Sequence, residues 1–578
     1  MNNRTQHLEK QPTSVTRRSF LGGGVSALGA ITIRSAAGQQ AKPSSFLDLL
    51  RAPDGVVAYG AFAKTLPAAG TPLQRTGEQW HGGPILIETL VQPKGLQLTL
   101  AAPTTPIAVV HLRWQAQVAP DLRVLGDAWE RSYGDLGWRD LIPERVMPWY
   151  VATHDGAACH GYGVQTDAAA LCFWQVDPEG VSLWLNVTNG GDGVALGSRK
   201  LTMATVVTRR GAEGESSTAA VAELCRVMCA RASRPVVPIY GANDWCYSYG
   251  QSTAQTILRD TAFIVDLSPS GAARPFSVID EGYVNGTAAW PDMARLAQAM
   301  KQQTARPGIW IRPLRVAKDA DRAWLLPDAR FGEKKDRARE LAYDPTHPQA
   351  REQIRAKVRE VTGWGYEMVK HDFSTYDLLG QWGFEMGPQP TLPGWSLHDR
   401  SRTNAEVIAG LYALLRDAAG DRILLDGCNT VGHLGQGIFD LQRTGDDTSG
   451  RQWERTRRMG VNTLAFRLPQ NGTFYTVDAD LVGITEDIPW HFNQQWLDVL
   501  ARSGAATMVS AGPPARGVEQ RAALRAAFQM AASGGIASRP TDWMESSAPE
   551  RWQPNAQGSA ELRYRWSGQQ GASAFLGP

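Results

Sequence analysis

Two short segments of this 578-residue sequence carry aspartates whose spacing could support catalysis. One is Val369–Phe373, which contains Asp372, and the other is Arg443–Thr448, which contains the adjacent Asp446 and Asp447. Each set of carboxylates follows an apolar stretch that is typical of the end of a strand. Hydrolysis of a glycosidic bond needs one carboxylate at the sugar carbon and another that moves a proton at the leaving oxygen. The two segments therefore predict glycosidic chemistry.

The region that must position these aspartates alternates strand and helix patterns from residue 236 onward. Candidate strands are 237–239, 276–279, 308–311, 368–371, 423–425, 439–442, 462–466 and 507–510, and candidate helices are 293–303, 348–362, 403–419, 494–503 and 519–530. Eight strands separated by helices predict a (β/α)8 TIM barrel over 236–535. A doubly wound open sheet is the alternative, but no Gly-rich phosphate fingerprint follows the first strand.

The flanking regions have a different rhythm. Residues 42–235 alternate apolar and polar positions in short runs, for example 95–100, 107–112 and 181–187. This period-two pattern predicts an N-terminal antiparallel β-sandwich, which a helix over 218–232 closes. Residues 536–578 are predicted to form a short C-terminal β region, with too few residues for a complete second sandwich and one strand candidate over 562–566.

The first 41 residues predict a twin-arginine signal peptide. Arg17 and Arg18 precede an apolar, Gly/Ala-rich stretch over 21–33, and small residues follow over 35–38. The apolar stretch is too short to span a bilayer stably. We expect export in the folded state to the periplasm or the medium, without stable membrane association after the signal is removed. A disordered basic tail is the alternative interpretation.

Composition limits the classes of partner and cofactor. The formal net charge is +2, and no dense Lys/Arg run provides the basic surface that nucleic-acid binding needs. The six cysteines lack paired spacing typical of zinc sites, so buried thiols are expected. We therefore predict no nucleic-acid partner, no metal and no cofactor; the sequence does not predict the oligomeric state.

Active sites of such barrels lie at the carboxyl ends of the strands, and here those ends are rich in carboxylates. In chain order the polar and aromatic residues at these positions are Asp244, Trp245, Asp280, Glu281, Trp310, Arg312, Lys370, Asp372, Asp426, Cys428, Arg443, Asp446, Asp447, Asp478 and Asp480. Carboxylates at several strand ends, with cations among them, predict a pocket for a polyhydroxy ligand.

Several of these segments resemble motifs of glycoside hydrolase families 27 and 36, the α-galactosidase superfamily. Lys370–Phe373 resembles the family's Lys-x-Asp nucleophile motif, and Ile279–Tyr283 resembles its Ile-Asp-Asp-Gly/Cys-Trp. Asp426–Asn429 followed by Arg443–Thr448 is similar to the acid/base region, and Val477–Asp480 to Asn-Asp-Pro-Asp. The resemblance covers about residues 240–545, and the sandwich-then-barrel order matches family 36.

The resemblance implies a retaining mechanism. Asp372 would be the nucleophile and Asp447 the acid/base, with Asp446 as the alternative, and the working carboxyls would stand about 5–5.5 Å apart. Lys370 would help to keep Asp372 ionised. We expect burial or the neighbouring Asp446 to raise the pKa of Asp447, because an acid must hold its proton until it is needed.

The resemblance also implies sugar-binding roles. Asp280 and Glu281 would bind the axial hydroxyl and its neighbour, and Trp310 would form an apolar wall or belong to the core. Arg443 would bind a sugar hydroxyl or form a structural salt bridge, and Cys428 would be a small packed wall residue. The remaining predicted substrate-binding residues are Asp244, Trp245, Arg312, Lys370, Asp478 and Asp480.

Two departures from the family motifs concern the substrate. Glu281 replaces the usual Asp and advances the carboxylate by about 1.5 Å, which favours L-arabinopyranose over galactose, and Tyr283 replaces a Trp. We predict an exported retaining exo-glycosidase that acts on terminal α-galactosides. Alternatives are a β-L-arabinopyranosidase, an α-N-acetylgalactosaminidase, a transglycosidase, a non-catalytic sugar-binding protein or a twin-arginine-exported redox protein.

Overall fold

The structure is a computed structural model that describes residues 45–61, 70–271, 273–285, 289–317, 319–334, 341–535 and 537–573. The predicted signal peptide, residues 1–41, lies outside the described residues. The described residues, which begin at Ser45, form one compact unit, so the sheets described below belong to a single body.

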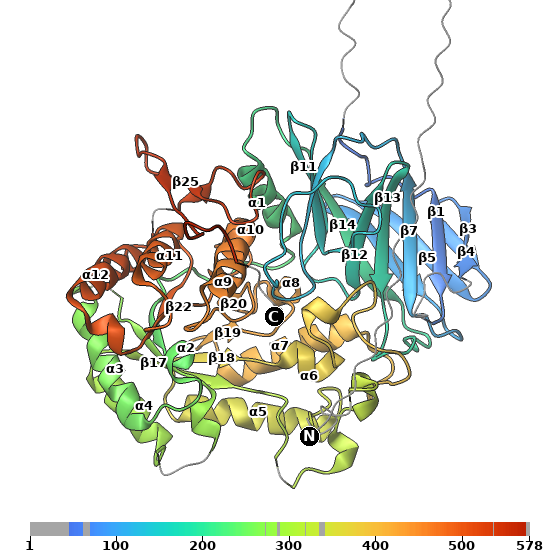
Figure 1. The fold of residues 1–578 in the computed structure, drawn as a ribbon. Coiled ribbons are helices and arrows are strands. Elements are labelled where there is room, and N and C mark those ends of the chain that lie inside the picture. Colours follow the sequence, from blue (N-terminus) through green and yellow to red (C-terminus); the bar gives the residue numbers. More distant parts are fainter. Residues whose placement is uncertain are drawn as a thin grey trace, which may run out of the picture. The chain divides into compact units, whose positions relative to one another are not determined.

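The N-terminal part forms two antiparallel sheets (Figure 1). Their strand orders are β2-β1-β7-β13-β12-β9 and β3-β4-β5-β6-β14-β11-β10-β8. The strands are β1 (Gly55–Tyr59), β2 (Thr71–Pro72), β3 (Gln74–Thr76), β4 (Gln79–Gly82), β5 (Ile85–Gln92), β6 (Gly95–Ala101), β7 (Val109–Gln115), β8 (Arg123–Gly126), β9 (Met147–Pro148), β10 (Tyr150–His154), β11 (Cys159–Val164), β12 (Leu171–Asp177), β13 (Gly180–Asn186) and β14 (Leu201–Arg209).

The three runs named from the period-two pattern, 95–100, 107–112 and 181–187, overlap β6, β7 and β13. In β6 the side chains of Leu96, Leu98 and Leu100 are buried and alternate with partly exposed polar side chains, as expected when one face of a strand packs against a core. Helix α1 (Ser217–Met228) follows; it begins after the N-cap Ser216 and ends before the predicted limit at 232.

A sheet of nine parallel strands follows along the chain. Its order is β21-β20-β19-β18-β17-β16-β15-β23-β22, and the two strands at the ends of this order are consecutive in sequence, with Ala479 and Asp480 between them. The strands are β15 (Tyr240–Asn243), β16 (Phe276–Ile279), β17 (Arg306–Ile311), β18 (Met368–His371), β19 (Leu424–Gly427), β20 (Leu441–Arg443), β21 (Thr476–Asp478), β22 (Leu481–Ile484) and β23 (Thr507–Ala511).

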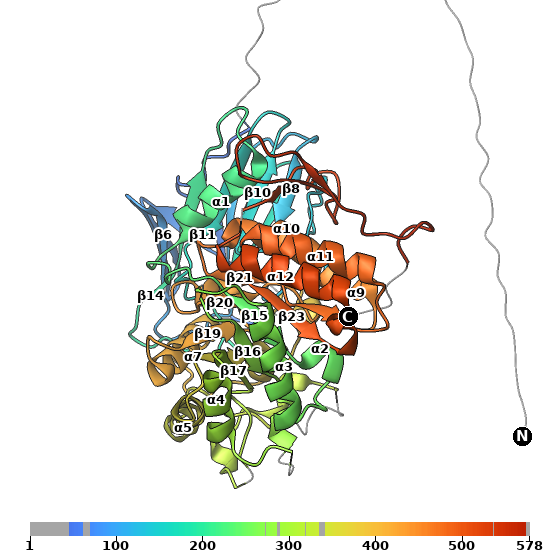
Figure 2. The same ribbon diagram turned by 90° about the vertical axis from the view of Figure 1, so that its left-hand side faces the viewer.

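Helices connect most of these strands. They are α2 (Trp245–Ser248), α3 (Ala254–Leu267), α4 (Met293–Gln302), α5 (Pro348–Gly363), α6 (Ser374–Leu379), α7 (Asn404–Ala419), α8 (Gly432–Gly435), α9 (Trp453–Thr456), α10 (Thr463–Arg467), α11 (Trp490–Ser503) and α12 (Val518–Ala532). Figure 2 shows α3, α4 and α12 lying beside strands β15, β16 and β17, and each of these helices contacts at least one of the strands. Amphipathic patterning predicted α4, α5, α7, α11 and α12 to within a few residues, whereas α3 was not predicted.

Two strand predictions in this region were wrong. Residues 462–466 were predicted as the seventh strand, but they lie in a π-helical turn and in α10, and the strand is β21 further along. A short apolar run buried on all sides has no periodicity that separates strand from helix. The first strand is β15 rather than residues 237–239, because the apolar run continues through Tyr240 into a glycine and an alanine.

The C-terminal region forms a three-stranded sheet of β24 (Arg539–Pro540), β25 (Arg551–Gln553) and β26 (Leu562–Arg563). Strand β26 covers only the start of the predicted 562–566 strand. Among the residues that the structure describes, no helix is long and apolar enough to cross a membrane.

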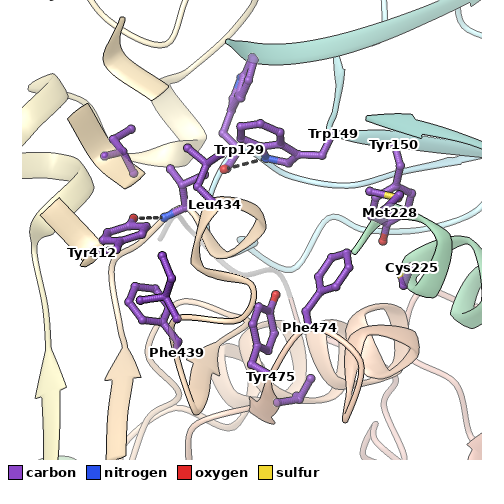
Figure 3. Close-up of a cluster of buried hydrophobic side chains, with 14 of the residues drawn as sticks. Trp129, Trp149, Tyr150, Cys225, Met228, Tyr412, Leu434, Phe439, Phe474 and Tyr475 are labelled. Atoms are coloured by element: carbon purple, nitrogen blue, oxygen red, sulfur yellow. Dashed lines mark hydrogen bonds between the residues drawn. The ribbon is translucent and has the colours of Figure 1, made fainter. Parts of the chain in front are cut away.

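A shared apolar core joins the N-terminal sheets to the parallel sheet and its helices. Figure 3 shows Trp149 and Tyr150 from the N-terminal sheets beside Tyr412 of α7, Leu434 of α8 and Phe474, all of them buried. In the same cluster the indole of Trp149 donates to the carbonyl of Trp129 at 3.1 Å. The two parts are therefore packed against each other through a buried apolar cluster, which holds the segment that follows β8.

Candidate active site

A pocket of about 300 Å³ lies at the carboxyl ends of the parallel strands. Pockets of this size suit a small ligand such as a single sugar residue. It is lined by Arg131, Tyr133, Trp245, Asp280, Glu281, Trp310, Lys370, Asp372, Phe373, Trp382, Phe384, Asp446 and Asp447. Eight of these thirteen were predicted from the sequence, and the structure brings all eight to one pocket.

Asp372 is presented at the end of β18 by a tight turn. Phe373, the next residue, adopts a left-handed conformation with φ 61°, an unusual backbone for a residue with a side chain and one often found at functional positions. The N–H groups of Phe373 and Asn429 donate to Oδ1 at 2.7 and 3.1 Å, and the indole of Trp310 donates to Oδ2 at 3.1 Å. Three N–H donors fix the orientation of the carboxylate.

The ammonium of Lys370 lies against Asp280 rather than against Asp372. Its Nζ is 2.8 Å from Oδ2 of Asp280, which also accepts from the amide of Asn243 at 2.8 Å. Burial opposes the charged form of Lys370, but the negative charges around it, Asp280 foremost, together outweigh burial, and the pKa of Lys370 is raised well above its usual range. The expected direct pairing of Lys370 with Asp372 is therefore corrected: the ion pair crosses from β18 to the end of β16.

Asp446 and Asp447 are adjacent in sequence but differ in environment. Asp446 is buried and forms two ion pairs, with Arg131 at 2.8 Å and with Arg455 at 2.6 Å. The side chain of Asp447 is 36% exposed and contacts Arg443 at 3.0 Å. Asp446 is thus held as a structural ion pair, whereas the carboxylate of Asp447 faces the pocket with room for a ligand.

The pKa of Asp447 contradicts the expectation from the sequence. Burial would raise it, but the guanidinium groups of Arg443 and Arg131 outweigh burial, and the pKa of Asp447 is lowered below its usual range. The nearest groups are cations rather than the carboxylate of Asp446, which is neutralised by its own partners. Asp447 is therefore ionised in the ligand-free protein at neutral pH.

Arg443 does not line the pocket but supports Asp447 from below. It is fully buried and bridges Asp447 and Asp480, whose Oδ1 lies 3.1 Å from Nη1. Asp480 has φ 69° and accepts from the backbone N–H of Thr448 at 2.6 Å. Burial, against the attraction of Arg443, raises the pKa of Asp480 to about 6.

Most of the other predicted substrate-binding residues that do not line the pocket are buried behind it. Arg312 makes a two-point ion pair with the buried Asp377, at 2.9 and 2.5 Å, and stacks on Phe373. Asp244 accepts from the N–H of Asp280, and burial raises the pKa of Asp244 to about 6. Cys428, Asp478 and Asp480 are likewise buried, and for these residues the direct binding role is corrected to a supporting position.

Sequence reasoning missed one wall of the pocket that comes from the N-terminal sheets. The segment Trp129–Tyr133, between β8 and β9, lies along the loop after β20, where Ser132 donates to Thr444 at 2.8 Å and accepts from Asp446 at 2.9 Å. This pairing brings Arg131 and Tyr133 to the pocket. The only sequence signal is a pair of charged residues between aromatic ones, which does not indicate a position in space.

The second missed wall is aromatic and follows α6. Trp382 stacks on Tyr376 with ring centroids 4.3 Å apart, and Phe384, 50% exposed, meets the edge of Tyr133 at 4.9 Å. Aromatic rings at a pocket rim offer flat apolar faces to a ligand. The pocket therefore combines a carboxylate-rich floor with an aromatic side.

Comparison with known proteins identifies this architecture. No family model and no curated protein matches the sequence. The α-galactosidase TtGalA from Thermus thermophilus, in complex with p-nitrophenyl α-D-galactopyranoside, is 17% identical, with a TM-score of 0.57 over 83% of this chain and 97% of that chain. Its stachyose complex gives 0.53, at 17% identity, over 77% and 97%.

A further solved structure, the family 36 α-galactosidase AgaB from Geobacillus stearothermophilus, is 12% identical with a TM-score of 0.51, over 83% of this chain and 73% of that chain. These structural neighbours are α-galactosidases of the glycoside hydrolase superfamily to which the motifs point. The likeness shows that the chain has their fold.

Proposed function

We propose that this protein is an exported retaining exo-glycosidase that hydrolyses terminal α-galactosides. The observation that carries the proposal is that Asp372 and Asp447, one after β18 and the other after β20, line one sugar-sized pocket. The fold shared with α-galactosidases supports the same reaction class.

In the proposed mechanism Asp372 attacks the anomeric carbon while the bond to the leaving oxygen breaks, and that oxygen takes a proton from Asp447. A covalent glycosyl-enzyme ester forms on Asp372. Asp447, now a carboxylate, removes a proton from water, which attacks the anomeric carbon and releases Asp372. Because its pKa is lowered, Asp447 is ionised as the second step requires, whereas the first step requires Asp447 to bind a proton.

Glu281 favours a second candidate substrate. Its carboxylate lines the pocket next to Asp280, and burial, followed by the charge of Asp280, raises the pKa of Glu281 above its usual value. The extra methylene relative to Asp shortens the pocket by about 1.5 Å. A β-L-arabinopyranoside, which lacks the hydroxymethyl group of galactose, fits such a pocket.

We also propose how the sheets close and where the protein works. The two antiparallel sheets would pack as a β-sandwich. The parallel sheet would close as a (β/α)8 barrel through Ala479 and Asp480, which join its end strands. The twin-arginine pattern supports export, and replacing Arg17 and Arg18 with lysines should retain the protein in the cytoplasm on cell fractionation.

A panel of nitrophenyl glycosides tests the function. We expect release from the α-D-galactopyranoside or the β-L-arabinopyranoside, with loss of turnover in Asp372→Asn and a shift toward galactose in Glu281→Asp. NMR of the first sugar released should show the anomer of the substrate. No release from any galacto-configured glycoside would refute the proposal.

A further inference from the structure

Glu130 is a buried carboxylate that lies beside the pocket without lining it. It belongs to the N-terminal segment Trp129–Tyr133, and only 1% of its surface is exposed. Burial raises the pKa of Glu130 to about 7, against the opposing effects of Arg131 and of its hydrogen bonds. Burying a carboxylate costs free energy unless its oxygens are fully hydrogen-bonded, so its partners indicate what it does.

Three donors from three different places meet this carboxylate. The hydroxyl of Tyr133 donates to Oε1 at 2.5 Å, and the backbone N–H of Gly383 donates to the same oxygen at 2.8 Å. The side-chain amide of Asn429 donates to Oε2. The first partner belongs to the N-terminal segment, the second to the loop after α6, and the third to the loop after β19.

The Asn429 contact leads directly to the proposed nucleophile. The backbone N–H of Asn429 donates to Oδ1 of Asp372 at 3.1 Å. The same residue accepts from the N–H groups of Thr375 and Tyr376, at 3.0 and 2.9 Å, so it also fixes the start of α6. Restraining the side chain of Asn429 therefore restrains one of the three donors that orient the carboxylate of Asp372.

The Gly383 contact leads to the aromatic wall. Gly383 lies between Trp382 and Phe384, which both line the pocket. A Cβ at position 383 would lie 2.7 Å from Cγ of Glu130 and 2.9 Å from the ring of Tyr133. The loop therefore packs against Glu130 so closely that only glycine fits.

The segment that carries Glu130 is itself held rigidly. Figure 3 shows Trp129 in the apolar cluster, where its carbonyl accepts from the indole of Trp149. Its own indole donates to the carbonyl of Gly387 at 2.9 Å, and the carbonyl of Glu130 accepts from Arg467 at 2.5 Å. A rigidly held carboxylate can hold other groups in place.

We infer that Glu130 is a positioning residue for the reaction, through which the N-terminal sheets fix both the nucleophile and the aromatic wall of the pocket. This inference rests on the proposed function. Glu130 acts through Asn429 on the orientation of Asp372, and through Gly383 and Tyr133 on the shape of the pocket.

The hydrogen-bond pattern predicts that a neutral or shorter side chain cannot take over the role of Glu130. A carboxylate only accepts, and its two oxygens receive two N–H donors and one hydroxyl. In Glu130→Gln the amide NH₂ must face either Gly383 or Asn429, both of which present N–H groups, so one donor is left unpaired. Aspartate keeps the charge but shortens the reach by about 1.5 Å.

The test compares Glu130→Gln with Glu144→Gln in the full chain. Glu144 is an exposed carboxylate in the same region between β8 and β9 and serves as the matched control. We measure kcat and KM on whichever nitrophenyl glycoside the wild-type protein hydrolyses, together with thermal unfolding. Glu130→Gln should lower kcat at least tenfold and raise KM, while Glu144→Gln should match wild type.

Two further variants separate the effect of Glu130 on Asp372, through Asn429, from its effect on the aromatic wall, through Gly383. They also keep the test valid if Glu130→Gln does not fold. Asn429→Ala should lower kcat with little change in KM, and adding Glu130→Gln should lower kcat no further. Gly383→Ala should raise KM while kcat stays within about threefold of wild type.

The outcomes that oppose the inference are distinct from failure of the proposed function. An active wild type with unchanged kinetics in folded Glu130→Gln would overturn the positioning role and leave the function intact. Full additivity of the effects of Glu130→Gln and Asn429→Ala on kcat would also overturn the positioning role. If Glu130→Gln does not fold, a wild-type kcat in Asn429→Ala together with a wild-type KM in Gly383→Ala would overturn it. A wild type that hydrolyses no glycoside would overturn both.

Discussion

Arg131 lies 2.8 Å from Asp446 and 3.6 Å from Asp447, and it comes from the N-terminal sheets rather than from the strand that carries the two aspartates. The guanidinium of Arg131 forms an ion-pair network with Asp446 and Arg455 and also lies close to the carboxylate of Asp447. Arg131 therefore contributes to the different roles of the adjacent carboxylates of Asp446 and Asp447. Asp446 holds the segment in place, and Asp447 is left to face a substrate.

We expect Asp447→Asn and Asp446→Asn to fail in different ways. Asp447→Asn should lower kcat about 10²–10⁴-fold on substrates with poor leaving groups, because the proton donor is lost. The free energy of unfolding should fall less than in Asp446→Asn, because Asp447 is partly exposed and Arg443 keeps its second partner, Asp480. Asp446→Asn removes the partner of two guanidinium groups and should lower the free energy of unfolding by about 3 kcal/mol. Steady-state kinetics and urea unfolding measure the two effects.

Added azide supplies a control for Asp447→Asn. It attacks the glycosyl-enzyme without needing a base, so it should restore turnover of a nitrophenyl glycoside in Asp447→Asn and yield a glycosyl azide. Azide rescue of Asp446→Asn instead would assign the acid/base role to Asp446.

Arg131→Gln should move the basic limb of the pH profile upward. Burial raises the pKa of Asp447, and Arg443 and Arg131 lower it, so removing Arg131 raises it. A higher pKa keeps the acid form populated to higher pH, and the limb in kcat/KM should shift by about one pH unit. Arg131→Lys, which retains the charge, should shift it less.

The shift of the basic limb of the pH profile in Arg131→Gln should depend on the leaving group of the substrate. A nitrophenolate departs with little help from an acid, so the basic limb of Arg131→Gln should move most on an alkyl galactoside. Equal profiles for Arg131→Gln and wild type on the alkyl substrate would exclude control of Asp447 by Arg131.

Residues close to a strand end could be predicted from the sequence, because the parallel arrangement alone brings strand ends together. Asp372 and Asp280 follow strands that the apolar pattern located correctly, and both line the pocket. Arg131 and Tyr133 could not be predicted, because they reach the pocket through tertiary packing of a segment without regular structure. Trp382 and Phe384 lie on a long loop whose path depends on contacts with Glu130 and Tyr133.

The partner of Lys370 shows a second limit. Residues 370 and 372 lie two apart at a strand end, so their side chains are expected on the same face. The sequence does not give the direction of a long side chain on that face, and the ammonium reaches across to Asp280. Asp280 follows β16, and β17 lies between β16 and β18, with Trp310 of β17 paired with Lys370. Which strand end the ammonium reaches is therefore decided by strand order and register, which no local pattern reveals.

Lys370→Met should destabilise the fold as well as the site. The ammonium of Lys370 and the carboxylate of Asp280 are both buried and lie 2.8 Å apart. Removing one partner leaves an uncompensated charge in the interior. A loss of about 3–5 kcal/mol in the free energy of unfolding is expected. The double variant Lys370→Met/Asp280→Asn should recover part of this loss, and strict additivity in urea unfolding would show that the pair is not coupled.

Glu130 should make stability depend on pH in a direction opposite to that of most carboxylates. The ordinary pKa of a glutamate is 4.5, and burial is the chief cause that raises the pKa of Glu130 to about 7 in the folded protein. The charged and titratable groups that face Glu130 are Arg131, Tyr133 and Asp446. The folded state thus binds the proton more tightly than the unfolded state. This contribution is fully present below about pH 4.5 and is lost as pH rises to about 7, amounting to about 3 kcal/mol.

Chemical denaturation at a series of pH values measures this contribution. Stability of the wild type relative to Glu130→Gln should fall between about pH 4.5 and pH 7 and then level off, because the glutamine does not titrate. Glu144→Gln should follow the wild-type curve throughout, since an exposed carboxylate gains little from folding. Parallel curves for wild type and Glu130→Gln would mean that the carboxylate at the junction of the two parts keeps an ordinary pKa, and that its three donors offset the whole cost of burying it.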